Sequence, residues 1–510
     1  MIILDGKSLD LKQYVLVARG KEKVVIAKQA IEAVQLACQY VKDIAKGTKA
    51  VYGINTGFGK LSDVPVKPED VGILQKNLLM SHACGMGDAL PCEVVRGMMV
   101  LRINALIKGY SGIRLETIEK LLELLNKDII PVVFEKGSLG ASGDLAPLSH
   151  MSLPLLGLGE VFYQGKRMKT LDCFQQANIT PLPFLMAKEG LSLINGTQAM
   201  NARGALILFD AFQLEKLATL SLSMSLEALQ GIVDAFDPRV HTVRNQIGQM
   251  QVAKDVLYNL KNSKNVTHQG ELRVQDAYSL RCSPQVHGAI LDTLNYVHDI
   301  VIREMNAVTD NPIVFPSEKE AISAGNFHGE PLALAFDFLG IALSELANIS
   351  ERRLERLVNP QLSNGLPPFL SHQSGLNSGF MIVQYSAASL VSENKVLSHP
   401  ASVDSIPSSA NQEDHVSMGS ISVNKASTIL SNVQSVIGME MFTACQAIDL
   451  RNSPDRLGLK TSMAYKLIRS KVPYINNDEM MYPHLHKMKA LIQSGELYTT
   501  VYGSDDEWTK

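Results

Sequence analysis

Long helical stripes of apolar residues constrain the fold of this chain more than any other feature of its sequence. In one stretch, five apolar residues recur at steps of four and three: Leu332, Phe336, Leu339, Leu343 and Leu346. This spacing predicts the buried face of a helix over about residues 330–357, which at ~1.5 Å per residue would be roughly 40 Å long. Similar patterns cover three further stretches, residues 202–233, 284–305 and 420–450. We therefore expect a bundle of long helices with these stripes as its core.

The N-terminal part of the chain has a different pattern, in which glycines separate shorter helical and extended stretches. Strands are expected at residues 1–4 and in a hairpin that joins residues 160–163 to residues 166–169. The chain also exceeds the length that one hydrophobic core usually spans. The sequence thus predicts a mainly α protein, with a mixed N-terminal region over residues 1–200 and a long-helix bundle over residues 201–510.

Charge and hydropathy exclude several classes of protein. The net charge is −3 and no basic cluster stands out, which argues against binding to nucleic acid or to an anionic membrane surface. Charged residues interrupt the apolar stretch at 202–233, and a membrane-spanning helix would carry them only at considerable cost. The N-terminus shows no signal-peptide pattern, so we expect a cytoplasmic protein.

Cysteine and histidine spacing argues against disulfides and metal sites. Six cysteines lie far apart, without a Cys-x-x-Cys pair: Cys38, Cys84, Cys92, Cys173, Cys282 and Cys445. This distribution predicts buried thiols in a reducing compartment. The histidines also lack the spacing of metal ligands, so we expect no metal site.

The stretch from Gly137 to His150, Gly-Ser-Leu-Gly-Ala-Ser-Gly-Asp-Leu-Ala-Pro-Leu-Ser-His, can generate an electrophile from the chain itself. If the backbone nitrogen of Gly143 attacks the carbonyl carbon of Ala141, loss of water leaves a five-membered imidazolone ring. Loss of the Ser142 hydroxyl as a second water leaves an exocyclic alkene. The bend required for this attack is crowded for any residue with a Cβ, and Gly143 has none. Such a group would supply chemistry for which other enzymes borrow a cofactor.

This run closely resembles the signature of the aromatic amino acid ammonia-lyases, whose Ala-Ser-Gly triad forms a methylidene-imidazolone group called MIO. Further matching segments extend the resemblance from Tyr52 to Met418. It implies a cofactor made from Ala141, Ser142 and Gly143, with no external cofactor and no metal. It also implies a homotetramer whose active sites are built from several subunits, and the helices of residues 201–510 would suit both assembly and completion of the site.

Tyr52 begins a glycine-rich loop over residues 52–59. A tyrosine, with a reference pKa of about 10, is too weak a base at neutral pH unless positive charge or a donor stabilises its phenolate. In the family, the matching tyrosine is implicated in removing the proton from the β-carbon of the substrate. The resemblance therefore assigns Tyr52 as a catalytic residue.

Gln275, Tyr278 and Arg281 are spaced three apart, which on a helix or helical turn would present them on one face. A guanidinium can bind an α-carboxylate through two parallel hydrogen bonds, an arrangement that lysine cannot replace. In the family the three matching residues line the active site. The resemblance places Arg281 on the substrate carboxylate and Tyr278 near the MIO group.

Asn195 and Phe327 match two further positions of the family. Asn195 comes shortly before a long helix, where asparagine commonly caps a helix end. By resemblance it donates a hydrogen bond at the MIO group and stabilises charge on the imidazolone oxygen. Phe327 matches a position that packs against the substrate ring. The run from Thr309 to Pro312 also matches the family, and we expect it to form a structural turn.

His82 and Glu413 indicate which aromatic amino acid is the substrate. Histidine-using members carry the pair Ser81-His82, and they have glutamate at Glu413 where phenylalanine enzymes typically have glutamine. A carboxylate accepts the N–H of an imidazole and favours its charged form, whereas it would be costly to bury against a phenyl ring. The resemblance therefore implies the conversion of L-histidine to trans-urocanate and ammonia, the first step of histidine degradation.

The sequence leaves the mechanism open. The substrate amine or its aromatic ring could add to the MIO alkene, and either Tyr52 or Glu413 could be the main base. An aminomutase would share the group and most of the pocket. A catalytically silent scaffold would be expected to lose Ser142, Tyr52 or Arg281, and all three are present.

Overall fold

The computed structural model describes residues 1–47, 50–57, 59, 64, 66–373 and 375–503. The chain forms two compact units. Unit 1 consists of residues 1–206, 298–337 and 400–424. Unit 2 consists of residues 207–297, 338–399 and 425–510. Each unit is described by itself.

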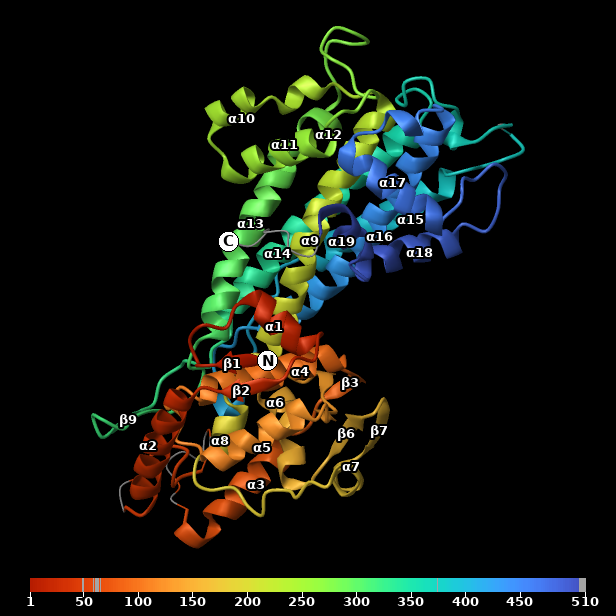
Figure 1. Ribbon diagram of the computed structural model, residues 1–510. Coiled ribbons are helices and arrows are strands. Elements are labelled where there is room, and N and C mark those ends of the chain that lie inside the picture. The colour runs from red at the N-terminus through yellow and green to blue at the C-terminus, as the bar shows by residue number, and fades with distance from the viewer. Residues whose placement is uncertain (48–49, 58, 60–63, 65, 374, 504–510) are drawn as a thin grey trace. The chain divides into compact units, whose positions relative to one another are not determined.

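Four long helices contain boundaries between the two units (Figure 1): α9 (Gln198–Leu229), α13 (Ser283–Met305), α14 (Glu330–Val358) and α16 (Gly419–Leu450). Their bounds agree within a few residues with the four helices predicted from apolar periodicity. The five stripe residues of α14 are all fully buried, as a core role requires. The predicted mainly α class is confirmed.

Each compact unit is made of three separate stretches of the sequence, whereas the prediction divides the chain once, at residue 200. The first change of unit falls after Leu206, close to the predicted boundary. The chain then returns to unit 1 for residues 298–337 and 400–424, because long helices carry it out of one unit and back. Residues 400–424 include Glu413, so unit 1 gathers site residues from both halves of the sequence.

Unit 1 combines short helices with small sheets. Its helices outside the four long ones are α1 (Leu11–Ala18), α2 (Lys28–Ala45), η2 (Pro68–Asp70), α3 (Val71–His82), α4 (Cys92–Leu106), α5 (Leu115–Asn126), α6 (Leu145–Ser152), η3 (Leu153–Leu156), α7 (Thr170–Ala177), α8 (Glu189–Ile194) and η6 (Ser409–Asn411). Its strands are β1 (Ile2–Leu4), β2 (Val24–Ile26), β3 (Met86–Ala89), β4 (Ile130–Pro131), β5 (Phe134–Lys136), β6 (Glu160–Tyr163), β7 (Lys166–Lys169), β8 (Ile313–Phe315) and β9 (Glu320–Ile322).

The strands of unit 1 pair locally. β6 and β7 form the predicted hairpin, with Glu160 opposite Lys169 and Tyr163 opposite Lys166, and β4 pairs with the other edge of β6. β1 is also present as predicted and lies parallel to β2. β3 pairs with β5 and β8 with β9, both antiparallel. The β3–β5 pair leads directly into the loop that carries the Ala-Ser-Gly triad.

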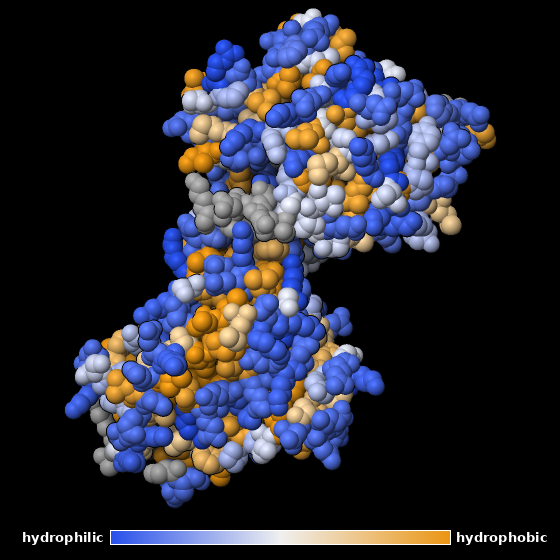
Figure 2. Space-filling view, viewed as in Figure 1, coloured by the Kyte–Doolittle hydropathy of each residue, from blue (hydrophilic) through white to orange (hydrophobic). Residues whose placement is uncertain are grey.

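The regular secondary structure in the described residues of unit 2 is all helical, with loops such as residues 260–277 between the helices. Besides its parts of the long helices it contains η4 (Val233–Phe236), α10 (Pro238–Arg244), α11 (Ile247–Asn259), α12 (Tyr278–Arg281), η5 (Pro368–Leu370), α15 (Met381–Leu397), η7 (Pro454–Arg456), α17 (Leu459–Lys471), α18 (Tyr482–Gln493) and α19 (Glu496–Tyr502). In the view of Figure 2, polar residues cover most of the visible surface of unit 2, and apolar residues gather in a patch on unit 1.

Helix α14 is long and apolar enough to span a membrane by length and composition, with a mean hydropathy of 1.6 over its most apolar window. Two thirds of that window, 67%, is buried inside the protein, which is typical of a core helix.

The cysteines follow the prediction only in part. Cys38, Cys173 and Cys445 are buried free thiols, and Cys282 is half-buried. Cys84 and Cys92 are exposed free thiols, so the expectation of burial is wrong for these two. Both lie near a helix end in unit 1: Cys84 is two residues beyond the end of α3, and Cys92 is the first residue of α4.

Candidate active site

The Ala141-Ser142-Gly143 triad lies in the loop between β5 and α6. Gly143 has a φ of +73°, and a Cβ built there would lie 2.2 Å from the carbonyl oxygen of Gly196. The two glycines also form an isolated parallel β-bridge. A side chain at residue 143 would have to push two backbone segments apart. This crowding comes from the distant residue Gly196, whereas the sequence prediction concerns the bend between Gly143 and Ala141.

The turn before the triad is held by a distant segment of unit 1. Gly140 has a φ of +64°, and its N–H donates to the Ser138 hydroxyl at 3.1 Å. The carbonyl of Gly140 accepts a hydrogen bond from the Ser417 hydroxyl at 3.0 Å. The N–H of Met418 donates to the Leu139 carbonyl at 2.9 Å. Residues 417 and 418 therefore fix the loop immediately before Ala141.

Asp144 anchors the other end of the triad. One carboxylate oxygen accepts hydrogen bonds from the hydroxyls of Ser138 and Ser420, each at 3.0 Å, and the other accepts from the N–H of Met200 at 2.9 Å. The N–H of Asp144 donates to the Gly196 carbonyl at 2.7 Å. Complete burial raises the pKa of the Asp144 carboxyl, and these hydrogen bonds counteract part of that effect. The triad is thus fixed on both sides.

Asn195 contacts the middle residue of the triad. It follows the last residue of α8, and its Nδ2 donates to the Ser142 carbonyl oxygen at 2.9 Å. The side chain is buried, and Oδ1 has no hydrogen-bond partner in the described part of the chain. This oxygen of Ser142 is the one that an imidazolone would retain. The Asn195 amide is therefore bound to the triad and not to the start of α9, and its role in stabilising charge stays a prediction.

Glu413 lies against the Ser142 side chain. The Ser142 hydroxyl donates to Oε1 of Glu413 at 2.7 Å, and the Ser408 hydroxyl donates to Oε2 at 2.7 Å. The backbones of Ser408 and Glu413 are also paired, with the N–H of Ser408 donating to the Glu413 carbonyl at 2.9 Å. Ser408 therefore orients the carboxylate, a role for which the sequence carries no signal. Glu413 and the triad are far apart in sequence and adjacent in space.

His82 is the last residue of α3. Its Nδ1 lies 3.0 Å from the Ser81 hydroxyl. Burial lowers the pKa of His82, and a backbone hydrogen bond at Leu78 together with the Glu413 charge opposes this with a smaller effect. The neutral imidazole is favoured, and Glu413 acts on it electrostatically. The two residues predicted to recognise an imidazole substrate thus belong to one region of unit 1.

Tyr52 lies in the turn that follows α2, and its hydroxyl accepts a hydrogen bond from the N–H of Gly59 at 3.4 Å. Burial raises the pKa of Tyr52, the charges of Glu413 and Asp310 raise it further, and the Gly59 donor lowers it. A hydrogen-bond donor that could stabilise a Tyr52 phenolate is therefore present. The two charged groups that act on Tyr52, however, are carboxylates and favour the neutral phenol. Phe58, within the predicted loop, lies outside the described residues.

The segment 275–281 belongs to unit 2. The predicted helical turn covers Tyr278 and Arg281 as α12, but Gln275 precedes it, because Ala277 is extended with φ −66° and ψ 161°. Gln275 and Arg281 line a cavity of about 280 Å³. Arg281 donates through Nε to the Asp276 carbonyl at 2.8 Å and lies 4.6 Å from the centre of the Tyr278 ring. Tyr278 is 70% exposed.

Phe327 is half-buried in the turn between β9 and α14, and its contact with a substrate ring stays a prediction. Gly329, two residues further, is close to the loop clamp, since a Cβ there would lie 2.8 Å from the Ser417 hydroxyl. Among the described residues no group of three His, Cys, Asp or Glu side chains could hold a metal ion.

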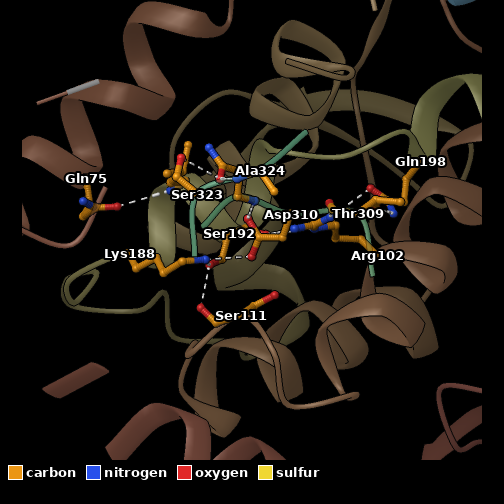
Figure 3. A network of polar contacts seen from close by, with 12 residues as sticks. Gln75, Arg102, Ser111, Lys188, Ser192, Gln198, Thr309, Asp310, Ser323 and Ala324 are labelled. Carbon is orange, nitrogen blue, oxygen red and sulfur yellow. Dashed lines mark hydrogen bonds and ion pairs between the residues drawn. The ribbon is translucent and has the colours of Figure 1, made fainter. Parts of the chain in front are cut away.

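A buried polar network includes Ser192 and Gln198, which flank Asn195 in the sequence (Figure 3). Lys188 forms an ion pair with Asp310 at 2.8 Å, and both side chains are buried. Arg102 of α4 bonds to the Ser192 and Thr309 carbonyls at 2.9 and 3.1 Å. The sequence predicts a structural turn at residues 309–312, and this network includes that turn. Arg102 and Lys188 were not predicted, although an arginine within the apolar stretch of α4 is a recognisable signal of a buried polar contact.

Comparison with known proteins supports the family resemblance. Residues 9–470 match the model of the family described as aromatic amino acid lyase. Histidine ammonia-lyase 1 of Fusobacterium nucleatum is 53% identical over 500 residues, covering 98% of this chain and 97% of that protein. The crystal structure of histidine ammonia-lyase from Trypanosoma cruzi superposes with a TM-score of 0.91 at 41% identity, covering 99% of this chain and 96% of that one. A tyrosine aminomutase from Streptomyces globisporus has a TM-score of 0.95 at 33% identity, with both chains fully covered.

The chain therefore belongs to the aromatic amino acid lyase family.

Proposed function

We infer that this protein is a carbon–nitrogen lyase that eliminates ammonia from L-histidine to give trans-urocanate, the first step of histidine degradation. The observation that carries this inference is the position of Glu413, whose carboxylate accepts a hydrogen bond from the Ser142 hydroxyl at 2.7 Å. A carboxylate at this place suits an imidazole substrate, because it can accept the ring N–H. The relatives named as histidine ammonia-lyases support the same substrate.

The residues of unit 1 fit a MIO group formed from Ala141, Ser142 and Gly143. Gly143 occupies a backbone approach that a Cβ would block, and Asn195 already donates to the Ser142 carbonyl oxygen. When formed, this group supplies an electrophile that activates the substrate covalently, through its amine or through its ring. Asn195 would stabilise negative charge on the retained oxygen.

The other residues bind the substrate and move a proton. His82 and Glu413 would bind the imidazole ring, and Phe327 would pack against it. Arg281 would bind the α-carboxylate through its fork of N–H donors, with Gln275 and Tyr278 beside it. Tyr52 or Glu413 would remove the β-proton. The raised pKa of Tyr52 favours a phenol in this environment, so a phenolate base would need stabilisation from the substrate complex or another subunit.

A homotetramer with active sites shared between subunits and a cytoplasmic location belong to the same proposal. Tyr278 and the residues around it support shared sites, because this predicted site residue is 70% exposed on unit 2. Completion by another subunit would bury it.

An aminomutase is the second candidate function. The structural similarity to the tyrosine aminomutase of Streptomyces globisporus supports it. It would return ammonia to the β-carbon instead of releasing it. The protein incubated with L-histidine should release urocanate and ammonia in equal amounts. Accumulation of β-histidine in place of urocanate would contradict the lyase assignment.

A Ser142→Ala variant tests the cofactor. It should fold and assemble as the wild type does, should not lose two waters from the chain, and should produce almost no urocanate. The control is the wild-type chain, whose intact mass should be lower than the sequence mass by two waters. Near-normal turnover by the variant would refute the cofactor.

A further inference from the structure

Arg102 is a buried cation that bonds to neutral oxygens. It lies on α4 and its side chain is fully buried. Its Nε donates to the Ser192 carbonyl at 2.9 Å, and Nη2 contacts the same oxygen. Its Nη1 donates to Oε1 of Gln198 at 3.0 Å and to the Thr309 carbonyl at 3.1 Å. Burying a guanidinium without a directly bonded carboxylate costs free energy. We therefore expect a role that depends on the positions of the three oxygens to which Arg102 donates.

The partners of Arg102 surround Asn195 and Gly196. Ser192 lies in α8, three residues before Asn195, and Gln198 begins α9, two residues after Gly196. A Cβ built at Gly196 would lie 2.4 Å from Nη1 of Arg102 and 2.7 Å from the Thr309 carbonyl oxygen. The guanidinium is therefore in close approach to the backbone of residue 196.

Gly196 also contacts the triad. Its carbonyl accepts the Asp144 N–H at 2.7 Å, and it forms the β-bridge with Gly143. Asn195, the residue before it, donates to the Ser142 carbonyl at 2.9 Å. The segment 195–196 thus has the Arg102 guanidinium against its backbone. It is hydrogen-bonded to Ser142 and Asp144, and Gly196 lies in a β-bridge against Gly143. Any shift of this segment would move the amide that meets Ser142 and the carbonyl that crowds Gly143.

We propose that Arg102 is a positioning residue for the cofactor: it fixes residues 195–196 so that the triad is held in the bend from which Gly143 can close on Ala141, and so that Asn195 remains on the retained oxygen. This inference rests on the proposed function. In the reaction that it serves, one bond forms between the Gly143 nitrogen and the Ala141 carbon. The Ala141 oxygen leaves as water with the amide hydrogens of Gly143 and Ser142, which leaves a C=N bond between Ala141 and Ser142. The Ser142 hydroxyl leaves as a second water with the Ser142 α-proton.

The planar fork of an arginine is what this site uses. Three acceptors, from Ser192, Gln198 and Thr309, are reached by one rigid group. A lysine has a single nitrogen at the end of a flexible stem and cannot hold the same three acceptors at once. The Lys188–Asp310 ion pair supports the same turn, because Asp310 follows Thr309, and Lys188 donates to the Ser192 hydroxyl at 3.1 Å (Figure 3).

Arg96 provides a matched control on the same helix. It is buried in α4 like Arg102, six residues earlier, and it also bonds to carbonyls, those of Val17 at 3.1 Å and Leu125 at 3.1 Å. Unlike Arg102 it also bonds directly to a carboxylate, that of Asp128 at 2.9 Å. None of its hydrogen bonds with described residues reaches residues 192–198. An Arg96→Lys variant therefore reproduces the loss of a buried guanidinium without touching the segment behind the triad.

The experiment compares wild type, Arg102→Lys and Arg96→Lys by intact mass, by thermal unfolding and by steady-state kinetics on L-histidine. The wild type should lose two waters. Arg102→Lys should show a smaller fraction of doubly dehydrated chain, and the dehydrated fraction should have a kcat about 10²-fold lower with KM nearly unchanged, because a misplacement of about 1 Å has effects of this size. Arg96→Lys should match the wild type in dehydration and in kcat, whatever its melting temperature.

Complete dehydration of Arg102→Lys with the wild-type kcat would overturn the inference, and so would an equal loss of dehydration in Arg96→Lys. A wild-type chain that keeps both waters would instead refute the proposed cofactor itself. If Arg102→Lys does not fold, Gln198→Met removes one of the three acceptors at similar volume. It should show a smaller fall in dehydration and kcat, and wild-type values of both would overturn the inference.

Discussion

The loop at residues 137–143 in unit 1 and the segment at residues 275–281 in unit 2 both carry predicted site residues, but they differ in how their geometry is fixed. The loop is bonded on both sides of the triad, by Ser417 before it and by Asp144 after it. In the segment, Arg281 is bonded to the nearby Asp276 carbonyl, and Tyr278 is 70% exposed. The difference shows that residues of unit 1 hold the loop on both sides of the triad, whereas Tyr278 in the segment of unit 2 is largely exposed.

This comparison fits the chemistry that each region would perform. Closing a ring within a backbone requires groups to be held near the reacting geometry before any substrate arrives. Binding a carboxylate can be completed when the substrate and neighbouring subunits are in place. Two glycines at positive φ provide the strongest test: Gly143 in the loop is crowded, whereas Gly270, which precedes the segment 275–281 in unit 2, is not.

A Gly143→Ala substitution should give the largest effect. The new Cβ would lie 2.2 Å from the Gly196 carbonyl oxygen at a φ of +73°, so the loop could not keep its bend. We expect loss of double dehydration by intact mass and no measurable urocanate. The control is Gly270→Ala, which has a φ of +89° with nothing within 4 Å of its Cβ and should lose about 1 kcal/mol of stability while retaining dehydration. Full dehydration of Gly143→Ala would contradict the crowding argument.

Asn195→Ala should give the next largest effect, through catalysis rather than binding. Removing the Nδ2 donor at 2.9 Å from the Ser142 carbonyl should lower kcat by about 10²–10³-fold, as for the loss of one oxyanion donor. KM should change little, and steady-state kinetics normalised to the doubly dehydrated fraction measures both. A variant that raises KM with unchanged kcat would mean that Asn195 binds substrate instead.

Sequence alone predicts the long helices well, because apolar periodicity is a local pattern. The triad is also a local motif, and its role in forming the cofactor stays a prediction. Apolar periodicity locates α14 within a residue or two, and Gly143 is identifiable from the chemistry of ring closure. The contacts that hold the triad could not be predicted, since Ser417 and Ser408 are ordinary loop serines until the fold brings them to residues 140 and 413. The helical face expected for Gln275 failed for a local reason, the extended backbone at Ala277.

Arg281→Lys sharpens the other side of the comparison. The loss of paired hydrogen bonds to a carboxylate should cost about 1.5–3 kcal/mol, which corresponds to a KM for L-histidine roughly 10–100-fold higher. Dehydration should remain complete, because the segment 275–281 belongs to unit 2 and the triad to unit 1. Intact mass and steady-state kinetics on the same preparation separate the two effects. Incomplete dehydration would show that the two regions are not independent.

The smallest effect is expected from the pH dependence of stability at His82. Burial lowers its pKa below the ordinary value of 6.5, so on acidification the unfolded chain binds a proton at this residue before the folded chain does. At a pH above 6.5 the histidine is neutral in both the folded and the unfolded chain, so it does not change the free energy of unfolding. As the pH falls below 6.5 toward the lower pKa of the folded state, the free energy of unfolding decreases. Denaturant unfolding of wild type and His82→Gln at pH 7 and pH 5 measures this, with the wild type losing more stability than the variant. An equal decrease in the free energy of unfolding for both proteins would mean that the His82 imidazole ionises in the folded protein as readily as in water. The burial of His82 would then be absent from the unliganded protein.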